Sequence, residues 1–297
     1  MPMVSAKKML RDAVEGGYCV GAFNCTGLPQ LKAVIDTAAK LEAPVIIQTS
    51  VSPATFFTPE LWASAVRALA EQVDIPVCLH LDHCNEVDFC KRAADAGYTN
   101  IMIDASHHPF EQNIRITREV VDYCHAKGDI TVEGELGTVG GVEDQVVVAE
   151  DEAQLCDPEQ ALDFVERSGV DLFAPAIGTA HGVYKTENPK IDFERFECTQ
   201  EAVNGDTFRA PLIVHGGTGL KEDVVRRLVE AGGAKFNVST DLKYALIDAT
   251  ADYIAEHRED YNPGKLDKAV YQAIEARIAY WINLLGSAGK ANAAVGA

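Results

Sequence analysis

The sequence of 297 residues contains no apolar run long enough to span a bilayer, and its first ten residues, MPMVSAKKML, lack the apolar segment of a signal peptide. Cysteine is too sparse for a disulfide scaffold, because its eight copies are scattered along the chain and none forms a CxxC pair. No linker rich in Pro and Ser and no abrupt change of composition interrupts residues 1–285. We therefore expect one soluble, cytoplasmic domain whose thiols are reduced and mostly buried.

Basic residues are scarce as well. The chain has 26 Lys and Arg against 45 Asp and Glu, which gives a formal net charge of −19. A nucleic-acid surface needs clustered Lys and Arg to displace counterions from phosphates, so this balance argues against nucleic acid as a partner. An anionic small ligand must then be held locally, by backbone amides or by a metal ion.

What the sequence does contain is a series of short apolar runs separated by helical patterns. Near-continuous apolar runs are typical of parallel strands that are covered on both faces. Between two of them, residues 28–43 place apolar side chains at the i, i+3, i+4 spacing of an amphipathic helix. Eight such units predict an α/β fold, a (β/α)8 TIM barrel, although an open doubly wound sheet is an alternative. The predicted strands are residues 19–24, 44–50, 76–82, 100–106, 130–137, 171–178, 211–217 and 234–240.

Two helical patterns lie outside the repeat. Residues 5–15 predict a helix that caps the bottom of the barrel, and residues 265–286 predict a long amphipathic helix that ends at Gly286. The last residues, 287–297, are small and featureless, and we expect them to form a flexible tail. The predicted domain is therefore residues 1–286, a barrel with an N-terminal capping helix and a C-terminal helical extension.

Polar residues gather at the predicted ends of the strands, where barrels of this type place their chemistry. They are Asp82, His83, Asp104, Ser106, His107, Glu133, Glu135, His181, His215, Asn237, Ser239 and Asp241. Three neutral imidazoles from different strands, with an open fourth position, are a catalytic zinc arrangement, whereas a lone histidine is more often structural. Strand alternation puts His80 inside strand 76–82, as a hydrogen-bonded support for Asp82, and leaves His83 as the first residue beyond the strand.

Two further stretches suggest a ligand. HGGTG after the seventh predicted strand and NVSTD after the eighth lie where barrels commonly bind phosphate, although glycines at a tight turn need no ligand. The long segment TVGGVEDQVVVAEDEAQLCD after the fifth strand resembles a lid, with Gly140 and Gly141 as a hinge and Glu143 as a residue that could swing over the site. A solvated acidic loop is the alternative for this segment.

Taken together, the motifs resemble those of class II, metal-dependent fructose- and tagatose-bisphosphate aldolases. The matching stretches are HLDH, MIDASH followed by PFEQNI, VEGELG with GGVED, AIGTAHGVYK, PLIVHGGTGL and KFNVSTDL, in family order over about residues 5–286. The resemblance implies a lyase that cleaves a ketose 1,6-bisphosphate reversibly to dihydroxyacetone phosphate and an aldehyde such as glyceraldehyde 3-phosphate. It also implies a homodimer or homotetramer with no membrane partner.

The resemblance assigns roles to individual residues. It implies a catalytic Zn²⁺ held by His83, His181 and His215, a catalytic Asp82, and an auxiliary divalent cation at Asp104 and Glu135. A monovalent cation, Na⁺ or K⁺, is expected near the substrate phosphate, and Glu143 is our candidate for proton exchange at C3. The implied substrate-binding residues are Asn24, Gln48, Ser50, Gly182, Gly216, Gly217, Thr218, Asn237, Val238, Ser239 and Thr240.

One departure from the family pattern bears on the substrate. Many bisphosphate-specific members have an Arg in a DPRK-like stretch that reaches the second phosphate, whereas this chain has YNPGKLDK, with Gly264 at that position. Lys265 and Arg277 are possible replacements, although Arg and Lys are not interchangeable at a phosphate site. A ketose 1-phosphate without the distal phosphate is therefore an alternative substrate.

Three alternatives to metal-dependent aldol cleavage are compatible with a barrel of this kind. A metal-dependent phosphosugar epimerase would use similar ligands but leave the C–C bond intact. A Schiff-base aldolase is disfavoured because the sixth predicted strand, DLFAPAIG, has no lysine. A non-catalytic, metal-stabilised barrel is disfavoured because acidic side chains such as Asp82 are costly to bury without a role.

Overall fold

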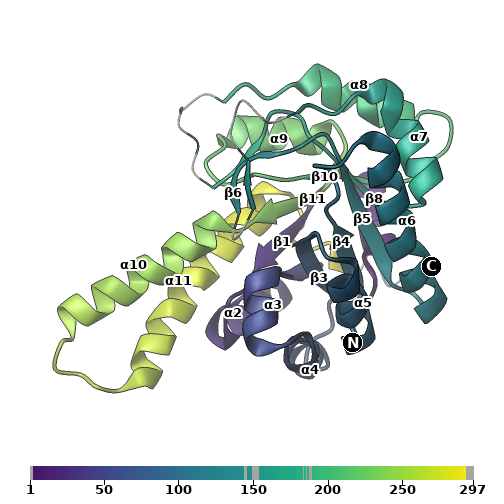
Figure 1. Cartoon of the computed structure of the whole chain (residues 1–297). Coiled ribbons are helices and arrows are strands. Elements are labelled where there is room, and N and C mark those ends of the chain that lie inside the picture. The colour runs from purple at the N-terminus through teal and green to yellow at the C-terminus, as the bar shows by residue number, and fades with distance from the viewer. Residues whose placement is uncertain are drawn as a thin grey trace.

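Eight parallel strands form a closed barrel in the computed structural model, so the predicted TIM barrel is confirmed (Figure 1). The model describes residues 3–143, 146–148, 154–182, 184, 186 and 189–291, with only the backbone of 142–143 and 146–148. Around the barrel the strands follow chain order, with the last pairing with the first. They are β1 (Val20–Asn24), β2 (Val45–Ser50), β3 (Val77–Cys84), β4 (Asn100–Ile103), β5 (Thr131–Leu136), β8 (Leu172–Pro175), β10 (Leu212–Val214) and β11 (Gly233–Val238). Each of them lies at one of the eight apolar runs.

Helices cover the outside of the barrel and bury their apolar faces against it. In α2 (Leu28–Lys40), for example, the predicted stripe consists of Leu31, Val34, Ile35, Ala38 and Ala39, of which the first four are buried and Ala39 is partly buried. The other helices of this layer are α3 (Val51–Phe57), α4 (Pro59–Ala70), α5 (Val87–Ala96), α6 (Phe110–Lys127), α7 (Pro158–Ser168), α8 (Phe193–Asn204) and α9 (Glu222–Glu230). No helix in the described part of the chain is long and apolar enough to cross a membrane.

The N-terminal helix α1 (Ala6–Gly16) closes one end of the barrel, as predicted. Its buried Met9 and Leu10 belong to the same apolar cluster as Ile46 of β2 and Cys78 of β3. These strand residues point into the barrel, so α1 seals the end opposite the carboxyl ends of the strands. The barrel therefore has one open end, at the carboxyl ends of the strands. The candidate site lies at this end.

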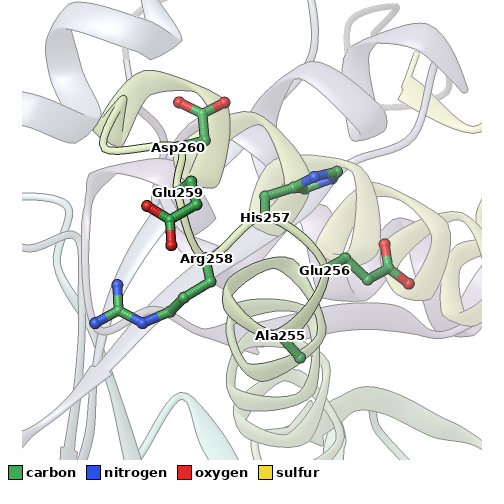
Figure 2. Close-up of a pocket in the computed structure, with 6 residues that line it drawn as sticks. All are labelled: Ala255, Glu256, His257, Arg258, Glu259 and Asp260. Atoms are coloured by element: carbon green, nitrogen blue, oxygen red, sulfur yellow. The ribbon is translucent and has the colours of Figure 1, made fainter.

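The C-terminal helices form a hairpin, here called the arm, that projects from the barrel (Figure 1). It consists of α10 (Thr240–Glu256) and α11 (Pro263–Leu284), and α11 confirms the predicted C-terminal helix. A hollow of about 550 Å³ lies at the tip of the arm, lined by the last two residues of α10 and by His257–Asp260 of the turn that follows (Figure 2). Ser287, at which we expected a flexible tail to begin, is fully buried, and the amide of Ala291 donates to Glu42 O (2.7 Å). Residues 292–297 of the predicted tail lie outside the described residues.

A small second sheet includes part of the segment that was predicted to form a lid. It pairs β6 (Gly140–Glu143) with β7 (Val146–Val148) and with β9 (Ala180–His181). Gly141, one of the two predicted hinge residues, lies opposite His181 with φ 105°, and a Cβ atom on it would come within 2.2 Å of His181 O. Glycine at this position therefore allows β6 to lie directly against the strand that carries His181.

Candidate metal centre and active site

A bulge in β3 explains why Asp82 and His83 are neighbours in the site. Leu81 pairs with Ile101 of β4, but the next paired residue is Cys84, so the register shifts between them. Within the bulge His83 has φ 46°, a left-handed conformation that is uncommon for residues other than glycine. Alternation would send consecutive side chains to opposite faces, whereas the bulge lets both enter the site. His83 therefore lies within β3. The sequence-based prediction, which placed it just beyond the end of the strand, was wrong on this point.

Three buried histidines converge at the open end of the barrel. The ring centroid of His83 lies 4.6 Å from that of His181 and 4.7 Å from that of His215, and His181 and His215 are 5.8 Å apart. Each ring offers one nitrogen within 4.8 Å of those of the others. They come from β3, β9 and the residue after β10, so three separate segments of the chain build the cluster.

Carboxylates orient two of these rings. Asp104 Oδ2 accepts from His83 Nδ1 (3.0 Å), and Glu133 Oε1 accepts from His215 Nε2 (2.8 Å). The remaining nitrogens, His83 Nε2 and His215 Nδ1, are buried and make no hydrogen bond of good geometry among the described residues, although Glu135 Oε2 lies 3.3 Å from His215 Nδ1. A ring nitrogen left free while the other donates to a carboxylate is the usual state of a metal-binding histidine. The cluster therefore fits a divalent metal ion.

The charges around the cluster favour a cation. Burial would lower the pKa of His83 and of His215, but neighbouring carboxylates raise both, and the pKa of His83 lies well above its usual range. The pKa of His181 is lowered by burial and by the two other rings. Although burial opposes ionisation of Glu133, Lys235 and His215 hold its pKa low. The site thus concentrates ionised carboxylates around imidazoles, an environment that a bound cation would stabilise.

A second group of donors lies beside the first. His83, Asp104 and Glu135 bring their ligand atoms within 4.8 Å of one another. Asp104 also accepts from Ser106 Oγ (2.7 Å), and Glu135 Oε1 accepts from the amide of Val139 (3.3 Å). The structure therefore brings together both residues that the sequence suggested for an auxiliary cation, and they share His83 with the histidine cluster.

Asp82 is held by three amide side chains. Asn24 Nδ2 and Gln48 Nε2 donate to Oδ2 (2.9 and 3.3 Å), and Asn237 Nδ2 donates to Oδ1 (3.2 Å). Burial would raise the pKa of Asp82, but adjacent positive and imidazole groups hold it well below its usual range. The carboxylate is therefore ionised and fixed in orientation, as a proton acceptor must be.

His80 behaves differently from the prediction. It is fully buried in the barrel, as expected, but its Nε2 lies 3.7 Å from Asp82 Oδ1, which is too far for a hydrogen bond. Burial, followed by the charge of Lys235, lowers the pKa of His80. The amides of Asn24, Gln48 and Asn237 hold Asp82 instead.

The loop after β10 and the start of α10 adjoin, as a phosphate site would require. The amide of Asp241 donates to Thr218 Oγ1 (3.3 Å), and Ser239 Oγ is buried without a hydrogen-bond partner among the described residues. Gly216 has φ 69°, and a Cβ atom there would come within 2.5 Å of Ala180 O. The loop and the first turn of α10 therefore offer close backbone approach near the histidines.

The remaining predicted substrate-binding residues are placed in different ways. Ser50 lies opposite Asp82 in the register of β2 and β3, and Gly182 follows His181 with φ 83°. Gly217 packs so closely that a Cβ atom would overlap the ring of Phe236. The side chain of Val238 belongs to the core between the barrel and the helices, so only its backbone could face a ligand.

Several other residues do not reach the cluster. His107 is exposed and stacks on His108, with ring centroids 4.0 Å apart. Gly264 and Lys265 begin α11 at the tip of the arm, away from the barrel (Figure 1). The side chain of Glu143 lies outside the described residues.

Two important residues were missed or only partly recognised from the sequence. Glu133 was noted at a strand end without a role, although it orients His215. Lys235 was not singled out, although it is fully buried inside the barrel. The alternation of side chains along β11 would have indicated it, because Lys235 and Asn237 are two residues apart and therefore lie on the same face of the strand.

Comparison with known proteins gives consistent matches over nearly the whole chain. The family model described as fructose-bisphosphate aldolase class-II matches residues 4–290. A curated fructose-bisphosphate aldolase from Geobacillus stearothermophilus is 40% identical over 294 residues, which cover 98% of this chain and 99% of that protein. The crystal structure of the YdjI aldolase from Escherichia coli K12 superposes with a TM-score of 0.84 at 32% identity, covering 97% of this chain and 99% of that one. The fructose-bisphosphate aldolase from Campylobacter jejuni shares the fold, with a TM-score of 0.83 at 24% identity over 97% of each chain.

Proposed function

The chain belongs to the class-II fructose-bisphosphate aldolase family and is therefore a lyase, and we propose that it is a zinc-dependent enzyme that cleaves fructose- or tagatose-1,6-bisphosphate reversibly. The products are dihydroxyacetone phosphate and glyceraldehyde 3-phosphate. The observation that carries this proposal is the convergence of His83, His181 and His215 beside the ionised Asp82. Metal ligands and a proton acceptor thus share one open end of the barrel.

His83, His181 and His215 would hold the zinc ion through one ring nitrogen each. When bound, zinc supplies Lewis-acid stabilisation of the negative charge that develops on the substrate oxygens during cleavage. The carboxylates of Asp104 and Glu133 keep two of the rings in the required orientation. The carboxylates of Asp104 and Glu135 could hold a second divalent cation.

Asp82 accepts the proton of the C4 hydroxyl group during cleavage and returns it during condensation. Its two oxygens are fixed by Asn24, Gln48 and Asn237, so the carboxylate is oriented before the substrate arrives. Proton exchange at C3 is assigned to Glu143.

The dihydroxyacetone phosphate end of the substrate is bound where the loop after β10 adjoins α10. Backbone amides of Gly216, Gly217 and Thr218, with the first turn of α10 at Ser239 and Thr240, supply donors for the phosphate. Gly182 and Ser50 border the same region, and a Na⁺ or K⁺ ion would offset part of the charge of the phosphate in this acidic protein.

The position of Gly264 favours a second candidate substrate, a ketose 1-phosphate. Gly264 lies at the arm tip, and the adjacent Lys265 is paired with Asp260 (2.6 Å). Arg277 is closer to the site, but it donates to Asp241 Oδ2 (2.8 Å) at the start of α10. These contacts occupy both cations that could replace the missing arginine, so the distal phosphate has no evident partner among the residues that the structure describes.

We also propose that the chain works in the cytoplasm as a homodimer or homotetramer. The cysteines are free thiols, and seven of the eight are buried, which suits a reducing compartment. The outer face of α10 exposes an apolar stripe, defined here as Tyr244, Ile247 and Ile254. These residues are 48–61% exposed, and a stripe of this kind on a projecting helix suits contact with a second copy.

A coupled assay tests the proposal. Dihydroxyacetone phosphate release is measured from fructose- and tagatose-1,6-bisphosphate and from the corresponding 1-phosphates, before and after chelation and after addition of zinc. We expect activity that chelation abolishes and zinc restores, with the bisphosphates preferred. Higher kcat/KM for the 1-phosphates would select the second candidate substrate, and full activity in a metal-free preparation would exclude the zinc mechanism. Epimerisation without triose phosphate release would exclude aldol cleavage.

A further inference from the structure

A buried ion pair occupies the barrel beneath the site. Lys235 Nζ lies 3.0 Å from Glu133 Oε2 and donates to Oε1 (3.3 Å), and both side chains are fully buried. Lys235 is the only lysine or arginine buried to this degree in the described part of the chain. Because buried charges are costly, a lysine in this position requires an explanation beyond packing. The mechanism above does not assign it a role.

Toward the proton acceptor, Lys235 determines how Asn237 is oriented. Its Nζ donates to Asn237 Oδ1 (2.7 Å), and Asn237 Nδ2 donates to Asp82 Oδ1 (3.2 Å). An ammonium group has donors and no acceptor, so the oxygen of the amide must face Lys235 and the NH₂ group must face Asp82. Without Lys235 the amide could rotate and present its oxygen to the carboxylate.

Toward the metal centre, Lys235 acts through Glu133. Its ammonium group lies 3.0 Å from Glu133 Oε2 and donates to Oε1 (3.3 Å), so it holds this carboxylate in place. Glu133 Oε1 in turn accepts from His215 Nε2 (2.8 Å), which turns Nδ1, 3.3 Å from Glu135 Oε2, toward the metal centre. The ammonium group of Lys235 is therefore connected by hydrogen bonds both to the proton acceptor, through Asn237, and to a proposed metal ligand, through Glu133.

We propose that Lys235 is a positioning residue that fixes the orientation of Asp82 through Asn237 and selects the metal-binding nitrogen of His215 through Glu133. This inference rests on the function proposed above for Asp82 and the histidines. Lys235 does not touch the substrate and is not a Schiff-base nucleophile, because its ammonium group is engaged by two acceptors below the site.

The test compares three variants with the wild-type protein. Lys235→Met removes the donors at similar length, and Lys235→Met/Glu133→Leu also removes the unpaired carboxylate, since a buried pair can often be replaced by apolar residues without loss of stability. Lys32→Met is the matched control, because Lys32 forms an exposed ion pair with Asp36 (2.8 Å). Zinc affinity is measured by competition with a chromophoric chelator, alongside Tm, kcat and KM.

For Lys235→Met we expect zinc affinity to fall roughly 10- to 100-fold and kcat to fall on the order of 100-fold, with KM changed by less than about 3-fold. In the double variant Tm returns toward the wild-type value, but zinc affinity and kcat stay low. The control changes none of the four quantities.

Two outcomes would overturn the inference. One is a folded Lys235→Met variant with wild-type zinc affinity and kcat. The other is a double variant that regains zinc affinity and kcat together with Tm, because this would mean that Lys235 serves stability alone. The zinc measurement needs no substrate. If the wild-type protein had no aldolase activity, the proposed function would be contradicted, but the effect of Lys235 on zinc affinity could still be measured. Trapping of Lys235 by borohydride with a ketose phosphate would also contradict its assignment as a positioning residue.

Discussion

The interior of the barrel and the tip of the arm each contain a lysine paired with a carboxylate, but the two pairs differ in consequence. In the barrel, Lys235 and Glu133 are 3.0 Å apart and neither side chain is exposed. On the arm, Lys265 and Asp260 are 2.6 Å apart, with side chains 62% and 28% exposed. The arm pair is shorter, yet water screens it and its loss leaves both charges solvated. Distance alone therefore says little about what an ion pair contributes, and burial decides it.

The same contrast holds for the remaining side chains of the two regions. In the barrel, histidines and carboxylates lie within hydrogen-bond range of one another, so changing one alters several others. On the arm, His257 packs against Tyr253, with ring centroids 4.8 Å apart, and its ring takes part in no such network among the described residues. The same type of substitution should therefore change zinc affinity, activity and stability much more in the barrel than on the arm.

The largest effect is expected for His215→Ala, compared with His257→Ala on the arm. Removing His215 takes away one of the three proposed zinc ligands and leaves Glu133 without the ring that donates to it. We expect zinc affinity to fall by at least roughly 100-fold and aldolase activity to be lost, as measured by chelator competition and triose phosphate release. His257→Ala should leave both unchanged, and zinc affinity retained by His215→Ala would remove this residue from the ligand set.

A smaller but still large effect is expected for Asp82→Asn, with Asp260→Asn as its arm counterpart. The asparagine cannot accept the C4 hydroxyl proton, so kcat should fall on the order of 1000-fold. Zinc should still bind, since Asp82 is not in the histidine cluster. Steady-state kinetics with a parallel zinc titration separates the two quantities. A kcat within about 10-fold of wild type would show that another group transfers the proton.

A substitution on the outer face of the arm should change the oligomeric state of the protein. Ile247→Asp introduces a charge in the centre of the apolar stripe, where Ile247 is 61% exposed. We expect a smaller assembled mass by size-exclusion chromatography with light scattering, because a charge buried at an interface is costly. Asp248→Ala, next along α10, is the control and should not reduce the mass. An unchanged mass for Ile247→Asp would mean that the stripe does not form the interface.

The smallest effect is expected for Lys265→Met at the arm tip. Because its pair with Asp260 is exposed, we expect Tm to shift by less than about 2 °C, as measured by differential scanning calorimetry. Breaking a buried pair typically costs roughly 3–5 kcal/mol, so Lys235→Met should lower Tm by several times more. Comparable shifts for the two variants would contradict the contrast between the regions.

Much of the fold could be predicted from the sequence. Apolar runs such as residues 44–50 became strands and the stripe of α2 became its buried face, because these patterns report burial on a regular period. The sheet of β6, β7 and β9 could not be predicted, since β9 has two residues and its pairing with Gly141 depends on long-range contact. The same limit applies to the arm, because the polarity of α10 gives no sign of where the helix projects.

The candidate site shows the same division. The residue types at the strand ends were sufficient to suggest His83, His181, His215 and Asp82, since their chemistry is evident from composition and position. The hydrogen bonds that hold them were not, and the predicted support of Asp82 by His80 is replaced by amides of Asn24, Gln48 and Asn237. Hydrogen-bond partners depend on distances of a few tenths of an ångström, which no sequence pattern carries.

By itself the sequence determined that this protein is an eight-stranded α/β barrel with histidines and acids at one end, because periodicity and polarity are properties of the local chain. Only the tertiary structure decided which of those groups meet. The bulge at His83 requires the register of β3 on β4. The hydrogen bonds that connect Asp82 to His215 through Lys235 join β3, β11, β5 and the residue after β10. Such contacts exist only once the barrel has closed, because closure brings β3, β5, β10 and β11 around one interior.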